Sequence, residues 1–292
     1  MVNPTWYGFL PTGVISIMQG GENPDQLAEW RADGMKIIPT IGDFGDAFLV
    51  TKPDLRTSII GQIVKLADQM NYDGIDIDFE NYPVTSRDAF SDFIEQLSAK
   101  LHADHRLLSV AVHPKTDDAG TWSGAAAQDW TRIAPAVDVF TIMTYDYTDR
   151  NQPPGPISPP NWVHDVLTYA ATVTDLHKVR MGLPFYGYSW LGDNPPATTT
   201  TWQSANRLIQ SFHLTIARAP SDMEAHIEVK ARGLPKQAIY FADSAGIEYK
   251  LQHILKAFPE LGGVAIWGIG GEDPSDWDVL RAARQPNCVL NL

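Results

Sequence analysis

One short segment of the chain carries acidic side chains at a spacing that could do chemistry. It reads Asn71-Tyr72-Asp73-Gly74-Ile75-Asp76-Ile77-Asp78-Phe79-Glu80. Side chains alternate between the two faces of a β-strand, so Asp76, Asp78 and Glu80 share one face and the apolar residues share the other. Carboxylates so close together cannot all ionise freely, and their repulsion raises the pKa of at least one of them. The segment therefore predicts a carboxylic acid that is protonated near neutral pH and can act as a general acid.

Two other interpretations of these carboxylates are weaker. A solvated acidic strand end would require a buried strand to hold three inward carboxylates without a purpose. Oxygen ligands also suit calcium or magnesium, but no Gly-rich loop or neighbouring ligand cluster accompanies the segment. No metal and no cofactor are therefore predicted.

The elements that must position these side chains follow an alternating pattern. Strands are predicted at Met35–Ile41, Gly74–Phe79, Leu107–His113, Val137–Tyr145, Lys178–Phe185 and Gly263–Trp267, with weaker candidates at Thr5–Phe9 and Val14–Met18. Helical patterns lie between them, at Asn23–Gly34, Leu55–Gln69, Phe90–Leu101, Trp162–Thr172, Ser204–Phe212, Gly246–Phe258 and Ser275–Ala283. Such alternation is typical of βα units around a parallel sheet.

Two architectures fit repeated βα units over 292 residues: a closed (β/α)8 barrel and an open doubly wound sheet. The Gly-rich fingerprint of a dinucleotide site is absent after every strand, which favours an α/β TIM barrel formed by residues 1–292 as one domain. Residues 190–236 are expected to form a small insertion before the last strand. The two N-terminal strands are too close together for a crossover helix, so the first βα unit is expected to be atypical or missing. In a barrel, Glu80 would lie at the mouth, where active sites are built.

Composition excludes several classes of partner. The chain has 22 Lys and Arg against 35 Asp and Glu, a net charge of −13, so nucleic acid and anionic membrane surfaces would repel it. No apolar run approaches the ~18 residues of a membrane span, and 44% hydrophobic residues suffice for a core. The single cysteine, Cys288, excludes an intrachain disulfide. No signal peptide is readable at the N-terminus. The 9 Trp, 10 Tyr and 11 Phe suggest a ligand on which rings can stack, such as a sugar.

The spacing of Asp73, Asp76, Asp78 and Glu80 matches Asp-x-x-Asp-x-Asp-x-Glu. In this the chain resembles the family-18 glycoside hydrolases, which include chitinases and endo-β-N-acetylglucosaminidases. Later segments resemble the family's strands in the same order: Met143-Thr144-Tyr145-Asp146, Gly182-Leu183-Pro184-Phe185-Tyr186-Gly187 and Gly262-Gly263-Val264-Ala265-Ile266-Trp267. Asp243–Lys250 is similar to the segment that the family carries ahead of its last helix. The resemblance thus extends along most of the chain.

The resemblance implies a retaining hydrolase in which the N-acetyl oxygen of the substrate is the nucleophile. Glu80 would protonate the leaving glycosidic oxygen, and Asp78 would hydrogen-bond the acetamido N–H, with Asp76 modulating its protonation. Tyr145 would hold the acetamido carbonyl in line for attack. Substrate-binding roles are implied for five further residues: Asp146, Trp267, Met143, Tyr186 and Tyr7.

For Tyr7 and Tyr186, an ordinary packing role is an equal or better alternative. His113 and His164 form no ligand-spaced pair, and a structural or solvated role is expected for both. Two departures from the family pattern bear on substrate preference. Thr40-Ile41-Gly42-Asp43 replaces the family's Ser-x-Gly-Gly, and Tyr188 stands where many chitinases have Arg.

Three functions are compatible with the resemblance. The first is cleavage of β-1,4 bonds in chitin or chito-oligosaccharides. The second is cleavage of peptidoglycan or spore cortex at N-acetylglucosamine, favoured by the short insertion and the shallower cleft that it implies. The third is a chitinase-like lectin, which the presence of Glu80 and both strand aspartates disfavours. By resemblance, the protein is expected to be secreted or at the cell surface, to bind glycans rather than membranes, and to be a monomer.

Overall fold

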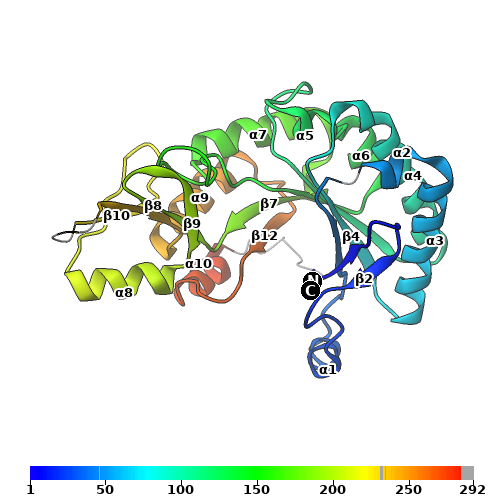
Figure 1. Cartoon of the computed structure of the whole chain (residues 1–292), viewed down its shortest axis with the longest axis horizontal. Coiled ribbons are helices and arrows are strands. Elements are labelled where there is room, and N and C mark those ends of the chain that lie inside the picture. The colour runs from blue at the N-terminus through cyan, green and yellow to red at the C-terminus, as the bar shows by residue number, and fades with distance from the viewer. Residues whose placement is uncertain (46, 231–232, 234, 284–292) are drawn as a thin grey trace. The chain divides into compact units, whose positions relative to one another are not determined.

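The chain forms two compact units. The computed structural model describes residues 1–45, 47–230, 233 and 235–283, and Cys288 lies outside them. One unit consists of Met1–Ile142 and Tyr169–Arg180, and the other contains Met143–Thr168 and the described residues from Met181 onward. Figure 1 shows the course of the chain and the labels of its elements.

The first unit is built on a mainly parallel sheet with the strand order β6-β5-β4-β3-β1-β2. Its strands are β1 (Thr5–Phe9), β2 (Ile15–Ile17), β3 (Thr40–Asp43), β4 (Gly74–Phe79), β5 (Leu107–Val112) and β6 (Val139–Ile142). Only β1 and β2 pair antiparallel, as a hairpin, whereas β1, β3, β4, β5 and β6 run parallel. The register places Thr40 of β3 opposite Asp76, and Gly42 opposite Asp78.

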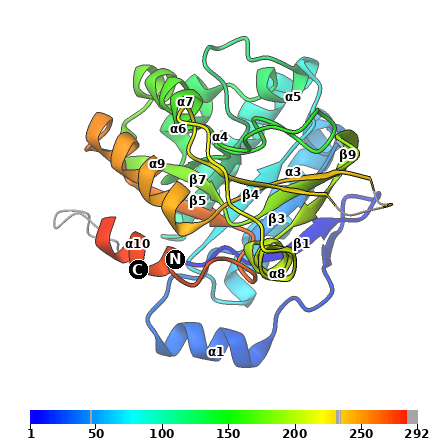
Figure 2. The same ribbon diagram turned by 90° about the vertical axis from the view of Figure 1, so that its left-hand side faces the viewer.

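Helices connect these strands. They are α1 (Pro24–Ala32), α2 (Phe48–Thr51), α3 (Pro53–Gln69), α4 (Arg87–Ala103), α5 (Ser123–Ala126) and α6 (Trp130–Ala136), with 3-10 turns at Val84–Ser86 and Leu176–Lys178. The Asn23 side chain caps α1 by accepting from two backbone N–H groups, and Pro24 occupies its first turn. Figures 1 and 2 show α3 and α4 along the sheet and α1 apart from them, beyond the hairpin.

The first βα unit is present and atypical, because the hairpin and α1 together form the connection from β1 to β3. Several strand boundaries differ from the sequence prediction, and two of them differ most. The strand predicted at Met35–Ile41 starts at Thr40, since Pro39 has no N–H to donate to a ladder. The strand predicted at Val137–Tyr145 ends at Ile142, because the N–H of Tyr145 turns back to the carbonyl of Met143 at 2.7 Å.

In the second unit, the end of β7 (Val179–Pro184) lies beside β12 (Gly263–Trp267), and the Phe185 N–H donates to the Trp267 carbonyl at 2.9 Å. An antiparallel sheet with the order β10-β11-β8-β9 occupies residues 187–241, and the range 190–236 falls inside it. Its strands are β8 (Gly187–Leu191), β9 (Asn194–Thr200), β10 (Ala225–Val229) and β11 (Gln237–Phe241). Helices α8 (Trp202–Phe212), α9 (Ser244–Ala257) and α10 (Asp276–Ala283) follow β9, β11 and β12, and α7 (Pro160–Val173) belongs partly to each unit.

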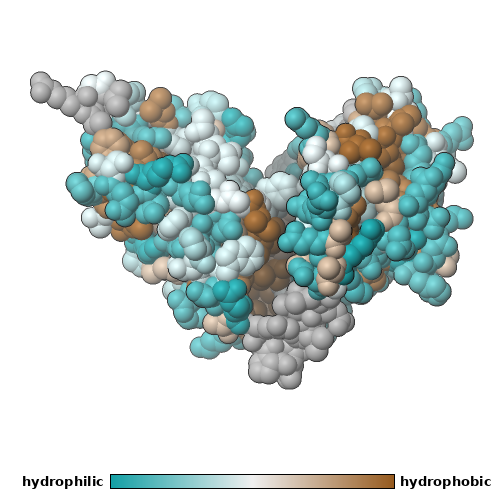
Figure 3. Space-filling view, turned by 90° about the horizontal axis from the view of Figure 1, so that it is seen from below, coloured by the Kyte–Doolittle hydropathy of each residue, from teal (hydrophilic) through white to brown (hydrophobic). Residues whose placement is uncertain are grey.

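Each unit has its own apolar packing. In the first, Phe79 of β4 stacks on Phe93 of α4 with ring centroids 5.3 Å apart. In the second, Ile227, Ile239 and Phe241 are buried under α8. Hydrophilic side chains cover much of the face drawn in Figure 3. None of the helices in the described part of the chain is long and apolar enough to cross a bilayer.

Candidate active site

The acidic strand of the first unit, β4, is buried along its whole length. Its start lies very close to β5, since a Cβ added to Gly74 would lie 2.3 Å from the Leu107 carbonyl oxygen. Ile75, Ile77 and Phe79 are fully buried in the apolar core. The strand period of two therefore places Asp76 and Asp78 on the face opposite these apolar side chains, as the sequence predicts.

The two strand aspartates lie in surroundings that favour their protonated forms. Burial raises the pKa of Asp76, and the hydrogen bond that Thr40 Oγ1 donates to it at 2.8 Å opposes part of that rise. Burial also raises the pKa of Asp78 well above its usual range, and the negative charges of Glu80 and Asp76 add to the rise. Within the described residues, the buried Asp78 Oδ1 makes no hydrogen bond. An acceptor that is desolvated and unpaired is suited to an N–H group of a ligand.

Glu80 follows the last residue of β4 and is more accessible. Its N–H donates to the Asp43 carbonyl of β3 at 2.8 Å, and its side chain is 25% exposed. The next residue, Asn81, has a φ of 61°, so the chain turns sharply after Glu80. A carboxyl group in this position can exchange a proton with a molecule outside the strand.

His113 is a candidate functional residue that sequence reasoning missed. It directly follows β5, and its Nε2 lies 3.6 Å from Oε2 of Glu80. Burial lowers the pKa of His113 to about 4, so the ring is neutral near pH 7. The half-exposed Trp122 ring lies edge-on to it at 4.6 Å between centroids. A signal was present, because the carboxyl ends of neighbouring parallel strands meet at one edge of a sheet.

In the second unit, Asp146 is held by two tyrosines. The hydroxyl groups of Tyr186 and Tyr188 donate to Asp146 Oδ1 at 2.5 and 2.9 Å. Burial raises the pKa of Asp146, and these hydrogen bonds oppose part of the rise. Asp146 has a φ of 57°, a conformation that aspartate tolerates better than most residues. Tyr188 was noted in the sequence only as a departure, although its alternation with Tyr186 signals a shared face.

The other predicted binding residues of this unit differ in accessibility. The Tyr145 ring lies edge-on to Tyr186 at 6.1 Å, so the structure brings Tyr145, Asp146 and Tyr186 together. Met143 is buried at 7% exposure. Trp267 ends β12 and is 47% exposed, so part of this residue is accessible to a ligand.

Tyr7 does not fit the predicted contact with a sugar. Its side chain is fully buried in the first unit, and its hydroxyl bonds to the Tyr72 hydroxyl at 2.7 Å and to Glu22 at 2.8 Å. With both ring and hydroxyl engaged, Tyr7 is a core residue. Across the residues that the structure describes, no three His, Cys, Asp or Glu side chains form a group able to hold a metal ion.

Comparison with known proteins identifies the family of the chain. The family model "Glycosyl hydrolases family 18" matches residues 6–272. The chain belongs to this family. It is therefore a glycoside hydrolase, and the family resemblance inferred from the motifs is confirmed.

Among curated proteins, the family-18 chain is 26% identical over 88% of its length to the uncharacterized glycosylase YvbX of Bacillus subtilis, covering 77% of that protein. It is 26% identical over 77% of its length to a cortical fragment-lytic enzyme of Bacillus anthracis, of which it spans about half, 53%. A chitinase structure from Chromobacterium violaceum superposes with a TM-score of 0.88 at 22% identity, covering 97% of this chain and 90% of that one. This likeness and the family match confirm the predicted fold class, the (β/α)8 barrel.

Proposed function

We propose that the protein cleaves β-1,4 linkages of N-acetylglucosamine-containing glycans with retention of configuration, using the acetamido group of the substrate as the nucleophile. The proposal rests on one observation: Asp78, whose buried Oδ1 makes no hydrogen bond within the described residues, is followed two residues later by the more accessible Glu80. Both are positions at which family-18 enzymes use carboxyl groups. A lectin needs no proton donor, so the presence of Glu80 disfavours the lectin alternative.

The proposed reaction has two steps. Glu80 gives its proton to the glycosidic oxygen while the acetamido oxygen attacks C1, so the leaving sugar departs and an oxazolinium ring forms. Glu80 then accepts a proton from water, whose oxygen attacks C1 and reopens the ring. Asp78 accepts a hydrogen bond from the acetamido N–H and stabilises the positive charge of the ring. Asp76 and Asp78 share one proton, so the two carboxyl groups do not both carry a negative charge.

The second unit supplies the proposed binding groups. Tyr145 donates to the acetamido oxygen and keeps it in line with C1, which contributes a positioning effect to the rate. Asp146, which Tyr186 and Tyr188 hold by hydrogen bonds, accepts a hydrogen bond from a hydroxyl or acetamido group of the sugar. Trp267 stacks on the apolar face of the pyranose ring.

The Glu80→Gln substitution tests the acid. The amide keeps the size of the side chain and cannot transfer a proton, so kcat on a chromogenic chito-oligosaccharide should fall by about 10²–10⁴-fold. Tm and circular dichroism should match the wild-type protein. Turnover within a few-fold of wild type would overturn the assignment.

The stereochemistry of the product tests the nucleophile. If the acetamido group attacks, NMR of a fresh hydrolysate should show the β-anomer first, and fully deacetylated oligomers should resist cleavage. An α-anomer as first product would rule out the mechanism while leaving Glu80 as the acid.

A second candidate function is cleavage of peptidoglycan at N-acetylglucosamine. It is favoured by the curated relatives, since the match to a cortical fragment-lytic enzyme covers 77% of the chain. Such a substrate would place the protein in the cell wall. Initial rates on colloidal chitin and on purified cortex peptidoglycan separate the two substrates, with the Glu80→Gln protein as the blank. Release of reducing ends from peptidoglycan alone would decide for this second candidate.

A further inference from the structure

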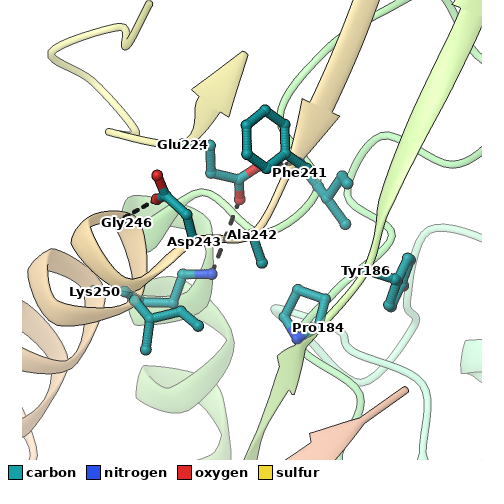
Figure 4. A pocket seen from close by; sticks show the side chains of 10 residues that line it. Pro184, Tyr186, Glu224, Phe241, Ala242, Asp243, Gly246 and Lys250 are labelled. Carbon is teal, nitrogen blue, oxygen red and sulfur yellow. Dashed lines mark hydrogen bonds and ion pairs between the residues drawn. The ribbon is translucent and has the colours of Figure 1, made fainter. Parts of the chain in front are cut away.

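A buried acidic side chain outside the proposed catalytic groups lies in the second unit. Glu224 immediately precedes β10, is 6% exposed, and accepts hydrogen bonds from the backbone N–H groups of Ile157 and Ser158, both at 2.6 Å. Nζ of Lys250, on α9, lies 3.9 Å from Oε1 of Glu224. Figure 4 shows the Lys250 amine pointing toward the Glu224 carboxylate at one side of a small cavity, with Pro184 and Tyr186 on another side of it.

A buried ion pair of this kind is weak evidence of a contribution to stability. Burial raises the pKa of Glu224, and Lys250 and the two N–H groups oppose the rise. Burial lowers the pKa of Lys250 to about 8, and Glu224 opposes that shift. Because desolvation of two charges offsets most of their attraction, apolar side chains of similar size would stabilise the fold as well or better. What the carboxylate supplies in particular is its pair of hydrogen bonds to residues 157 and 158.

Those bonds continue to the other end of the same loop, residues 144–158. The Ser158 hydroxyl donates to the Thr144 carbonyl at 2.5 Å, and the Thr144 hydroxyl donates to the Gly182 carbonyl at 2.8 Å. Thr144 and Ser158 are fully buried. Tyr145 and Asp146 directly follow Thr144, so the start of the loop is fixed relative to its end.

The side chain of Ile157 makes a second connection. It belongs to one buried cluster with Tyr186 and Tyr188, against which Tyr145 packs. The same two tyrosines donate to Asp146. A shift of the Ile157 backbone would therefore move the packing surface of the groups that hold Asp146.

We propose that Glu224 is a positioning residue. Through its two hydrogen bonds to the 144–158 loop, it holds Tyr145 and Asp146 in the positions from which they bind the acetamido group of the sugar. The inference rests on the proposed function for the roles of Tyr145 and Asp146. Small displacements of groups that align reactants reduce rates strongly, by up to about 10²-fold for 1 Å.

The Glu224→Gln substitution tests the proposal against Glu228→Gln as a matched control. Glu228 lies on β10, the strand that Glu224 immediately precedes, is 42% exposed, and pairs with Lys230 and Lys236. The amide that replaces Glu224 offers one oxygen where the carboxylate offers two. We expect kcat on a chito-oligosaccharide to fall by about 10–10²-fold with KM within about threefold, and no change in the control. Where the single variant unfolds, the double variant Glu224→Gln with Lys250→Met removes both charges, and the same changes in kcat and KM are expected of it.

Two further measurements separate positioning from loss of structure. A thiazoline-fused chitobiose mimics the cyclised acetamido group, and its affinity should fall in proportion to kcat, whereas the affinity for intact chitobiose should change little. Hydrogen exchange at the amides of Ile157 and Ser158 should accelerate in Glu224→Gln alone, whatever the activity. Wild-type kcat in a folded variant, or equal losses for both sugars, would overturn the role of Glu224. A wild-type protein inactive on every N-acetylated glycan would instead overturn the proposed function, with the exchange result still valid.

Discussion

At the scale of single residues, Asp78 combines a cost in stability with a use in chemistry. Its folded pKa is raised by burial first and by Glu80 and Asp76 next. A carboxyl with a raised folded pKa contributes stability that is complete below the unfolded pKa, near 3.9, and is lost as pH rises through the folded pKa. At neutral pH the ionised Asp78 carboxylate is therefore less stable in the folded protein than in the unfolded chain, where water solvates it.

The Asp78→Asn substitution should consequently stabilise the protein and impair the enzyme. Tm at pH 7 should rise above that of wild type, with no gain at pH 4, while kcat falls by about 10²-fold because the charge that stabilises the intermediate is lost. Differential scanning calorimetry at the two pH values and a chromogenic assay measure both effects. The same change in Tm at pH 4 and pH 7 would contradict the explanation.

His113 should make stability depend on pH in the opposite sense. Its folded pKa, lowered by burial to about 4 from 6.5, means that the unfolded chain binds more protons between these values, so stability is complete above pH 6.5 and is lost as pH falls toward 4. The loss amounts to about 2 kcal/mol at pH 5. His113→Asn should therefore show a smaller decrease in unfolding free energy between pH 7 and pH 5 than wild type, by denaturant titration. The exposed His105, whose φ of 57° asparagine tolerates, is the matched control, and an identical decrease in both variants would refute the prediction.

The sequence predicted the acidic residues of the site better than their neighbours. Asp76, Asp78 and Glu80 could be placed because a strand period and a motif define them. Glu224 could not, because it meets Ile157 from 67 residues away. His113 meets Glu80 from the end of the next strand, so the order of the strands could have indicated it although no motif does. The burial of Tyr7 depends equally on a distant partner, Tyr72.

At the scale of elements, the close approach of β4 to β5 at Gly74 constrains the position of the acidic strand. A Cβ at Gly74 would lie 2.3 Å from the Leu107 carbonyl oxygen, too close for any side chain. Gly74→Ala should destabilise the protein by about 2 kcal/mol and reduce activity, because β4 must shift and Asp78 and Glu80 shift with it. Gly61 of α3 is exposed, with nothing within 4 Å of an added Cβ, so Gly61→Ala should stabilise by about 0.5–1 kcal/mol. Urea denaturation measures both, and destabilisation by both changes would refute the close approach as the cause.

Element types and order followed from periodicity, whereas element ends followed from single hydrogen bonds. The strand predicted at Met35–Ile41 begins only after Pro39, which has no N–H. The strand predicted at Val137–Tyr145 ends before the Tyr145 N–H, which donates to the Met143 carbonyl. Apolar patterns persist through both points, so they could not reveal the ends. The antiparallel sheet of residues 187–241 was expected only as an insertion, because β9 lacks an alternation of apolar residues. In β10, Ala225, Ile227 and Val229 do alternate with polar residues, but the strand is only 5 residues long.

At the scale of the whole molecule, the net charge of −13 separates the two candidate substrates. Peptidoglycan carries carboxylates on its peptides, whereas chito-oligosaccharides are neutral, so only peptidoglycan should be repelled by an acidic enzyme at low ionic strength. The Debye length falls from about 30 Å at 0.01 M salt to about 8 Å at 0.15 M. Initial rates at substrate concentrations below KM should therefore rise several-fold over this range on soluble peptidoglycan fragments and stay constant on chitotetraose. Because the neutral substrate reports any effect of salt on the enzyme itself, equal responses on both substrates would show that the charge of the chain does not affect its choice of polymer.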